Sequence, residues 1–240
     1  MTIEAVALEG VPEVRPGDDL AALLDGLIEL RPTDVLVVAH KVVSKAEGRV
    51  VDLASVEPGE WARAFAAEWD KDPRAVQVVV DDAAEVLRAD GGRLICRTRH
   101  GFVCANAGVD RSNAGGEDRA ILLPLDPDGS ARALRAALGC AVVVSDSFGR
   151  PWRIGQMEIA VGCAGLAPLE DFRGSADRDG REMHTTHIAV AYQAAAAADL
   201  ARAKAAGQPA VRLRGLERHV LTEDGPGAAA LVRERSHDLF

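Results

Sequence analysis

Two aspartates stand out because small and hydroxyl-bearing residues surround each of them. Asp110 lies in the segment GFVCANAGVDRSN (101–113), and Asp146 lies in VVVSDSFGRPWRIGQ (142–156). Lone carboxylates beside unhindered backbone and hydroxyl groups are typical of sites that hold a cation or a phosphate. Alternatively, both aspartates only cap turns or helices, as most loop aspartates do.

A metal site is the sharper interpretation of these two segments. Asp146 follows the apolar run 141–144, which predicts a buried strand and puts the carboxylate at the strand's carboxyl end. Open α/β sheets bind their ligands at that end. With Ser147 and Asn113 beside them, Asp110 and Asp146 offer the oxygen ligands that Mg²⁺ or Mn²⁺ prefers in nucleotide sites.

Basic residues near glycines or strand ends could neutralise a polyphosphate. They are Lys41, Lys45, Arg49, Arg150 and Arg153. A nucleoside triphosphate needs its charge offset by such side chains and by a bridging metal. The alternative is a solvated basic face, which fits Lys45 least because it stands between a predicted strand and a glycine turn.

Two common phosphate-binding motifs are missing from the sequence, since neither GxxxxGK[ST] nor GxGxxG occurs. His40 is either a base or a structural residue at a strand end. His184 and His187 lack a carboxylate or cysteine partner at metal-ligand spacing, so we do not count them as ligands. The Trp152 side chain either stacks on the ring of a ligand or only packs against other residues of the protein.

Composition restricts the class of protein. The 240 residues carry a net charge of −9, which argues against general nucleic-acid binding but allows one anionic ligand held by local basic residues. No apolar run reaches eighteen residues, so we expect no membrane span, and the acidic N-terminal stretch does not match a secretory signal. The four cysteines show no CxxC pairing, which favours reduced thiols and a cytoplasmic location.

Apolar patterning predicts a mixture of strands and helices without strict βαβ alternation, and therefore an α+β (mixed α/β) fold. Strands are expected at 34–41, 76–80, 94–103, 141–145, 156–163 and 209–216. Helices are expected at 18–30, 58–70, 131–138 and 183–206. The segment 41–51 is expected to form a loop and a second short strand, and 171–180 an exposed loop.

Several long motifs, in order along nearly the whole chain, resemble the coenzyme F420-0:L-glutamate ligase family, also called the gamma-glutamyl ligase family. The motifs are HKVVSKAEGRVV, GFVCANAGVDRSN, LLPLDPDGSA, SDSFGRPWRIGQ, AVGCAGLAPLEDFRGSADRDGRE, VRLRGL and the terminal DLF. The resemblance implies the family's mixed α/β fold as a single domain over 1–240, with room for two subdomains, assembled as an intertwined homodimer.

The resemblance also implies the reaction. Such enzymes use GTP and Mg²⁺ or Mn²⁺, with K⁺ as a further candidate cation, to join L-glutamate to coenzyme F420-0 through a gamma-glutamyl amide. GTP first converts the acceptor carboxylate into an acyl phosphate, which the amine of glutamate then attacks. Most of the protein's contribution is positioning and charge stabilisation, so no protein nucleophile is expected.

Family positions carry over to this chain residue by residue. GTP-contacting positions match Val11, Pro12, Glu13, Val14, His40, Lys41, Lys45 and Asn113. Metal-ligand positions match Asp110, Asp146 and Ser147. The candidate charge stabilisers are Lys45, Arg150 and Arg153.

Two departures from the family pattern keep other functions open. Tyr192-Gln193 replaces an Asp-Glu pair that the family carries early in the C-terminal helix. The family's metal-binding glutamate would fall near Ala203 or Lys204, where this chain has no carboxylate. Arg202 or Lys204 could replace a cation by direct contact with phosphate. The alternatives are a ligase for another acceptor or amino acid and a non-catalytic nucleotide-binding dimer.

Overall fold

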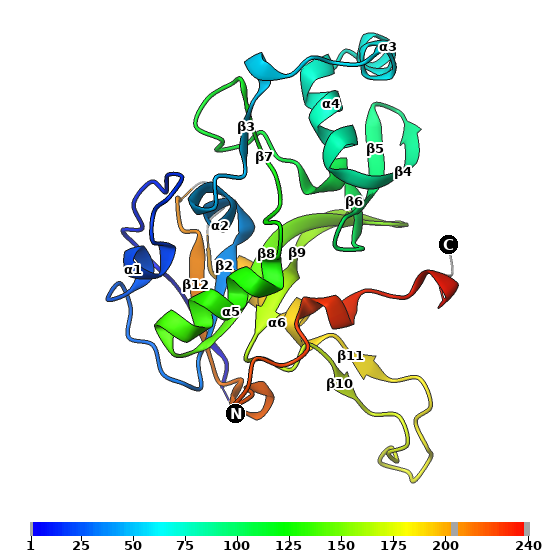
Figure 1. Ribbon diagram of the computed structural model, residues 1–240. Helices are drawn as coiled ribbons and strands as arrows, with labels where there is room; N and C mark the ends of the chain where they lie inside the picture. Colours follow the sequence, from blue (N-terminus) through cyan, green and yellow to red (C-terminus); the bar gives the residue numbers. More distant parts are fainter. Residues whose placement is uncertain (1, 203–205, 238–240) are drawn as a thin grey trace.

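A five-stranded sheet forms the centre of the molecule (Figure 1). The computed structural model describes residues 2–202 and 206–237. The strand order is β1-β12-β2-β8-β9, with bounds β1 Glu4–Ala7, β12 Ala210–Arg214, β2 Val35–Ala39, β8 Ala141–Arg150 and β9 Arg153–Ala164. Only β2 and β8 pair in parallel, and the other neighbours pair antiparallel. The mixed sheet confirms the α+β class.

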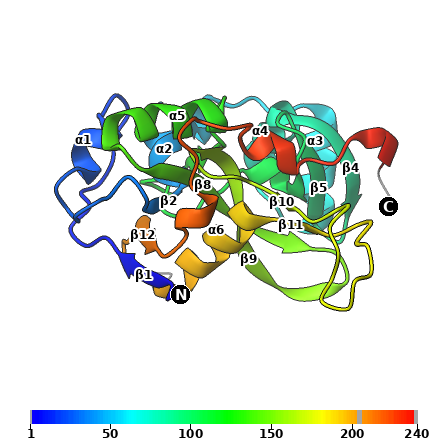
Figure 2. The ribbon, with the colours of Figure 1, turned by 90° about the horizontal axis from the view of Figure 1, so that it is seen from below.

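Helices cover both faces of this sheet. α5 (Pro127–Leu138) and α6 (Val190–Ala201) lie on opposite sides of it in Figure 2. The residues Val35–Val38 and Val142–Val144 are fully buried between them. α5 approaches β9 closely at Gly162, where a Cβ would stand 2.2 Å from the carbonyl oxygen of Pro127. A side chain at position 162 would therefore push α5 off the sheet.

A smaller unit with its own apolar cluster lies above the central sheet in Figure 1. It packs α3 (Glu60–Trp69) and α4 (Pro73–Asp82) beside a three-stranded sheet in the order β4-β5-β6. The bounds are β4 Ala83–Asp90, β5 Arg93–Thr98 and β6 Val103–Ala105. The two-stranded pair of β3 (Val50–Asp52) and β7 (Arg119–Ile121) lies between the units. The expected single domain over 1–240, with its subdomains, stays a prediction.

The remaining elements are short. They are α1 (Leu20–Leu24), α2 (His40–Ala46), the pair β10 (Glu170–Asp171) and β11 (His187–Ile188), and the 3-10 turns η1 (Leu53–Ser55), η2 (Asn106–Gly108), η3 (Glu217–His219), η4 (Ala228–Leu231) and η5 (Arg235–His237). Within residues 2–202 and 206–237, no helix has the length and apolar character needed to cross a membrane.

The structure corrects two predicted elements. The expected strand 76–80 lies in α4, where Asp72 is the N-cap and Pro73 occupies the first turn. Its valines face two clusters at helical spacing, since Val76 packs with the small unit while Val78 packs with Leu53. The expected loop after position 41 is α2, although the short strand β3 that follows it is confirmed.

Element bounds also differ from the predictions. α1 and α6 are shorter than expected, and α6 begins at Val190 because β11 takes up the preceding residues. The expected strand 94–103 is two strands joined by a turn at Gly101. β8 continues to Arg150 instead of ending before Asp146. The terminal DLF motif, 238–240, lies outside the described residues.

Asp128 joins three distant segments of the fold and carries a stability prediction. Its Oδ1 accepts hydrogen bonds from the backbone N–H groups of Cys163 (2.8 Å) and Ala228 (2.7 Å), and Oδ2 accepts from Ala229 (3.2 Å). Asp128→Ala leaves these donors unpaired and should lower the free energy of unfolding by about 1–3 kcal/mol. Asp128→Asn keeps one acceptor oxygen, so urea denaturation should show a smaller loss. Equal stability of both variants and the parent would contradict this role.

Candidate active site

The first turn of α2 lies beside Asp146 because the parallel pairing of β2 with β8 stops just before that residue. α2 begins at His40 directly after β2, and Ala39 at the end of β2 pairs with Ser145 of β8. Asp146 is the next residue along β8. The prediction that Asp146 ends a strand is wrong, since β8 runs on as an antiparallel ribbon with β9 after a bulge at Val144 and Ser145. Even so, Asp146 stands where the parallel pairing stops.

His40 is held against Asp146 in the protein interior. The ring is 1% exposed, and its Nε2 lies 3.2 Å from Oδ1 of Asp146, whose side chain is 12% exposed. The contact has ion-pair distance without hydrogen-bond alignment. Nδ1 lies 3.4 Å from the hydroxyl of Ser44. A buried imidazole next to a carboxylate orients that carboxylate and limits its contact with water.

Lys41, the next residue of α2, contacts the second aspartate. Its ammonium lies 2.6 Å from Oδ2 of Asp110 and donates to the hydroxyl of Ser112 at 2.6 Å. Burial tends to raise the pKa of Asp110, but the hydrogen bonds from Lys41 and Ser112 outweigh it and the net pKa lies below the ordinary value. Consecutive residues of one helix therefore contact both aspartates that the sequence singled out.

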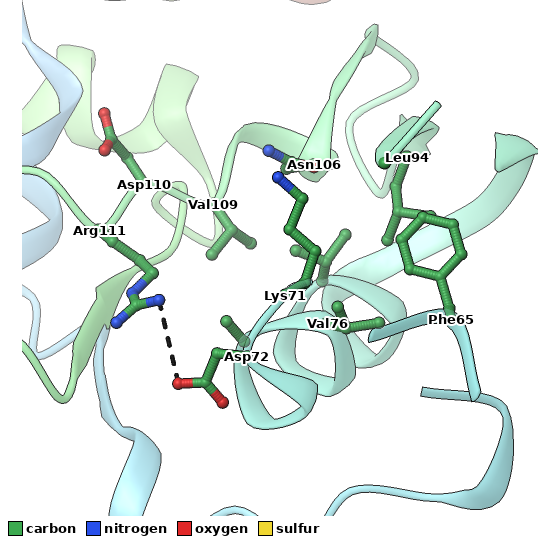
Figure 3. A pocket seen from close by; sticks show the side chains of 12 residues that line it. Phe65, Lys71, Asp72, Val76, Leu94, Asn106, Val109, Asp110 and Arg111 are labelled. Atoms are coloured by element: carbon green, nitrogen blue, oxygen red, sulfur yellow. Dashed lines mark ion pairs between the residues drawn. The ribbon is translucent and has the colours of Figure 1, made fainter. Parts of the chain in front are cut away.

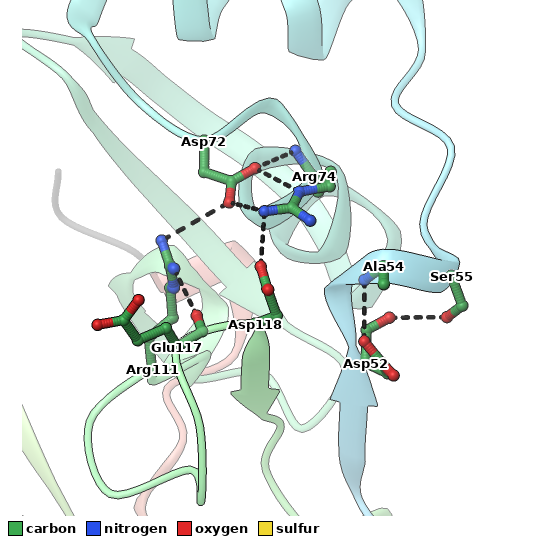
Figure 4. A network of polar contacts seen from close by, with 8 residues as sticks. All are labelled: Asp52, Ala54, Ser55, Asp72, Arg74, Arg111, Glu117 and Asp118. Carbon is green, nitrogen blue, oxygen red and sulfur yellow. Dashed lines mark hydrogen bonds and ion pairs between the residues drawn. The ribbon is translucent and has the colours of Figure 1, made fainter.

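A polar network anchors the loop that carries Asp110 (Figure 4). Arg74 contacts Asp72 at 2.9 Å and Asp118 at 2.8 Å. Arg111 donates to the carbonyl of Glu117 at 2.7 Å and lies 3.9 Å from Asp72. The hydrogen bonds from Arg74 hold the pKa of Asp72 below its ordinary value. Both ends of the loop are thus tied to the start of α4.

The segment of Val11, Pro12, Glu13 and Val14 meets α2 one turn further along. Lys45 is buried, and its ammonium lies 2.5 Å from Oε1 of the exposed Glu13. Val14 belongs to the central core and fixes the segment. The structure therefore brings this predicted nucleotide-binding segment to Lys45, the basic residue that the sequence favoured most.

Other candidate residues lie further out. Asn113 is exposed in the Asp110 loop with a left-handed backbone (φ +56°), next to Ser112. Arg150 and Arg153 pair across the end of the β8–β9 ribbon, and Arg150 donates to the carbonyl of Gly155 at 3.2 Å. Arg150 follows Asp146 by four residues, about 13 Å along an extended strand. The role of both arginines as charge stabilisers stays a prediction.

Ser147 leads to a buried ion pair that the sequence reasoning missed. Its hydroxyl donates to Oε1 of Glu158 at 2.5 Å, and its backbone N–H donates to Asp146 at 2.8 Å. The other oxygen of Glu158 lies 2.8 Å from the guanidinium of Arg202, with side chains 3% and 10% exposed. Arg202 thus neutralises a carboxylate, and its direct contact with phosphate stays a prediction. The available signal was that Ser147 and Glu158 stand opposite each other on the neighbouring strands β8 and β9.

The donor set suits a hard divalent cation. Among residues 2–202 and 206–237, no three His, Cys, Asp or Glu side chains are close enough to hold a metal by themselves. Two buried atoms near Asp146 lack a hydrogen-bond partner, namely Nε2 of His40 and Oγ of Ser145, whereas Oε2 of Glu158 is ion-paired with Arg202. Mg²⁺ commonly takes one or two carboxylates and completes its shell with substrate phosphates and water. Asp146 and Asp110 supply carboxylates of that kind, whereas the Ser147 hydroxyl donates to Glu158 and its role as a ligand stays a prediction.

Carboxylates that can hold a metal and lysines that can bind phosphates are suited to reactions that consume a nucleotide. Ligases that form carbon–nitrogen bonds are one class with this chemistry. The model of the family F420-0:Gamma-glutamyl ligase matches residues 10–215. The chain belongs to the F420-0:gamma-glutamyl ligase family.

Proteins of three archaea show the same relationship over their whole length. The chain is 42% identical to the coenzyme F420:L-glutamate ligase of Methanothermobacter thermautotrophicus, covering 100% of this chain and 99% of that protein. It is 43% identical to the enzyme of the same name from Methanopyrus kandleri, covering 100% and 97%. The counterpart from Natronomonas pharaonis is 46% identical, covering 99% and 94%.

Tyr192, the first departure from the family pattern, lies in α6. Tyr192 lines a cavity of about 230 Å³ together with Phe102 and Phe148. Burial raises the pKa of the Tyr192 phenol, so it stays neutral at physiological pH. Ala203 and Lys204, where the family glutamate would fall, lie outside the described residues.

Proposed function

We propose that this protein joins L-glutamate to coenzyme F420-0 in a reaction that consumes GTP and needs Mg²⁺ or Mn²⁺. The names of its relatives support the two organic substrates. The observation that carries the proposal is the first turn of α2, where His40 contacts Asp146 and Lys41 contacts Asp110. Lys45 supplies a second ammonium on the same helix.

The chemistry assigns a task to each charged group. The acceptor carboxylate attacks the γ-phosphorus of GTP, which forms an acyl phosphate and releases GDP. The amine of glutamate then attacks the acyl carbon, expels phosphate and loses a proton. A divalent cation between Asp110 and Asp146 would neutralise phosphate charge. Lys41 and Lys45 bind the phosphate oxygens, while His40 orients the Asp146 carboxylate.

Glu13 serves as a counter-ion for Lys45 until a nucleotide binds. The pair is 2.5 Å apart, but the Glu13 side chain is largely exposed, and exposed ion pairs contribute little free energy. A phosphate can therefore replace Glu13 on Lys45 without a large penalty. The neighbouring segment from Val11 to Val14 then lies along the bound nucleotide.

Lys45→Met should weaken this phosphate contact. The methionine keeps the buried stem but removes the ammonium, so kcat/KM for GTP should fall about 10²-fold. KM for glutamate should change little, since Lys45 contacts only the nucleotide. Arg88→Met is the matched control, because it removes a positive charge from an exposed pair with Asp90 outside the site. If Lys45→Met kept the parental kcat/KM for GTP, Lys45 would not be a nucleotide contact.

A product assay tests the reaction itself. The protein is incubated with GTP, Mn²⁺ or Mg²⁺, L-glutamate and coenzyme F420-0, and products are weighed by mass spectrometry. We expect one or more added glutamyl units and equal GDP, with loss of both when the metal is chelated. Parallel reactions with ATP and with or without K⁺ define the nucleotide and the monovalent cation. Product formed without nucleotide would overturn the proposal.

A second candidate function keeps the chemistry but changes a substrate. Tyr192-Gln193 replaces an acidic pair of the family pattern, and Tyr192 borders the 230 Å³ cavity near β8. Glutamate-dependent phosphate release without a glutamylated F420-0 would favour another acceptor. The absence of both glutamylated product and phosphate release would favour a non-catalytic nucleotide-binding protein.

We also propose a homodimer. Trp152 and Ile154 stand almost completely exposed at the tip of the β8–β9 ribbon, which projects from the central sheet (Figure 2). Large exposed apolar side chains at one tip are typical of a protein contact. Light scattering should give the mass of two chains, and Ile154→Asp should shift it toward one.

A further inference from the structure

The loop that carries Asp110 also borders a cavity of about 340 Å³ in the smaller unit (Figure 3). The cavity lies between α3, α4 and the start of β5, and Asp110 and Arg111 form its edge. Lys41, Lys45 and Glu13, which surround the proposed nucleotide site, do not line it. Asp110 therefore stands between two binding regions.

Part of the cavity wall is apolar. Phe65, Val76 and Leu94 are buried there, and the Phe65 ring stacks on Trp61 with ring centroids 5.4 Å apart. This stacking restrains the Phe65 ring. Ligand pockets usually have volumes of about 300–1,000 Å³. The cavity can hold a flat aromatic group, whereas the 230 Å³ cavity beside Tyr192 falls below that range.

Unused hydrogen-bond donors stand at the mouth of this cavity. Among the residues that the structure describes, none forms an ion pair or side-chain hydrogen bond with Lys71 or with the amide of Asn106. Both side chains extend from the cavity wall in Figure 3. Arg111, in contrast, already contacts Glu117 and Asp72. An ammonium and an amide over an apolar wall suit a ring that carries carbonyl oxygens and an imide.

The backbone at Asn106 is strained in a way that supports a binding role. Asn106 and Ala107 both adopt left-handed conformations, with φ of +54° and +53°, and Gly108 follows at +77°. Such residues cost free energy and gather at ligand sites, where the surrounding structure holds them. At Gly108 a Cβ would lie 2.7 Å from Leu123, so the turn needs glycine there. This turn presents Asn106 at the cavity.

We propose that the cavity binds the tricyclic ring of the deazaflavin acceptor, an inference that rests on the proposed function. The ring packs on Phe65, and its carbonyl and imide groups accept and donate hydrogen bonds at Lys71 and Asn106. The rest of the acceptor extends past Asp110, so that its carboxylate reaches the phosphate bound at Lys41. Nucleotide and acceptor thus approach Asp110 from opposite sides.

Fluorescence titration of F420-0 tests this site. Lys71→Met and Asn106→Asp should each weaken binding of F420-0 by about tenfold or more, with GTP binding unchanged. Aspartate tolerates the left-handed backbone at 106, which protects the fold. Arg88→Gln, on β4 of the same small sheet but away from the cavity, is the charge-matched control. A deazaflavin fragment without the phosphate and lactyl groups should compete with F420-0 in the parent and compete weakly in Lys71→Met.

The outcomes separate this inference from the proposed function. If the parent forms glutamylated product but both variants bind F420-0 as tightly as the parent, the ring lies elsewhere and the inference fails. If the variants lose GTP affinity and retain F420-0 affinity, the cavity belongs to the nucleotide and the inference also fails. If the parent neither binds F420-0 nor forms product, the proposed function fails first.

Discussion

Asp146→Asn should lower kcat by about 10³-fold while the protein stays folded. The change removes one negative charge beside His40 but keeps an oxygen that can accept the Ser147 N–H. Because Asp146 lies in a strand and is 12% exposed, this isosteric change tests its charge without disturbing the packing of β8. The neutral amide of the variant would bind a divalent cation more weakly than the carboxylate does. Phosphoryl transfer would then lose its main electrostatic support.

Direct metal binding separates the site from the fold in this experiment. Electron paramagnetic resonance of Mn²⁺ should show weaker binding by Asp146→Asn, whereas circular dichroism and the unfolding midpoint should match the parent. Asp90→Asn, at an exposed hairpin where Asp90 pairs with Arg88, is the matched control. Full activity with parental Mn²⁺ affinity would remove Asp146 from the metal site.

The central strands could be predicted because burial on both faces leaves a clear pattern. The apolar runs at 35–38 and 141–144 are uninterrupted, as expected of strands covered on both sides. The site residues on α2 could also be named, since His40 follows directly on such a run. What the sequence could not show is that the chain turns into a helix there without a loop. That turn places Lys41 and Lys45 on one helix.

The valine-rich segment 76–80 shows how packing overrides local preference. β-branched residues favour strands, but Asp72 and Pro73 start a helix whose valines fill two separate clusters. A helix that is apolar on two sides loses the one-sided pattern that identifies helices in a sequence. The cavity beside α4 could not be predicted for the same reason.

The ion pairs of the site were harder to predict from the sequence than its helices and strands. Glu158 and Arg202 lie on β9 and just after α6, and nothing local indicates that they meet. The sequence suggested phosphate as the partner of Arg202, because a lone basic residue near a lost metal ligand suits that role. The structure pairs Arg202 with Glu158, a buried carboxylate that needs a cation, and a further contact with phosphate stays a prediction.

Arg202→Met should therefore lower the free energy of unfolding by about 3–5 kcal/mol, the usual effect of removing one partner of a buried pair. The Glu158 carboxylate would remain 3% exposed in the parental packing, where the Ser147 hydroxyl donates to its Oε1. Urea denaturation measures the loss. Arg88→Met, which breaks the exposed pair with Asp90, should cost less than about 1 kcal/mol.

The double variant Arg202→Met/Glu158→Gln separates two roles for Arg202. Glutamine removes the buried charge but can still accept the hydrogen bond from Ser147, so most of the lost stability should return. If Arg202 acts only through Glu158, ligase activity returns with it, because Ser147 and Asp146 regain their positions. If stability returns while kcat/KM for GTP stays low, Arg202 contacts the phosphates directly, as its place in the sequence first suggested.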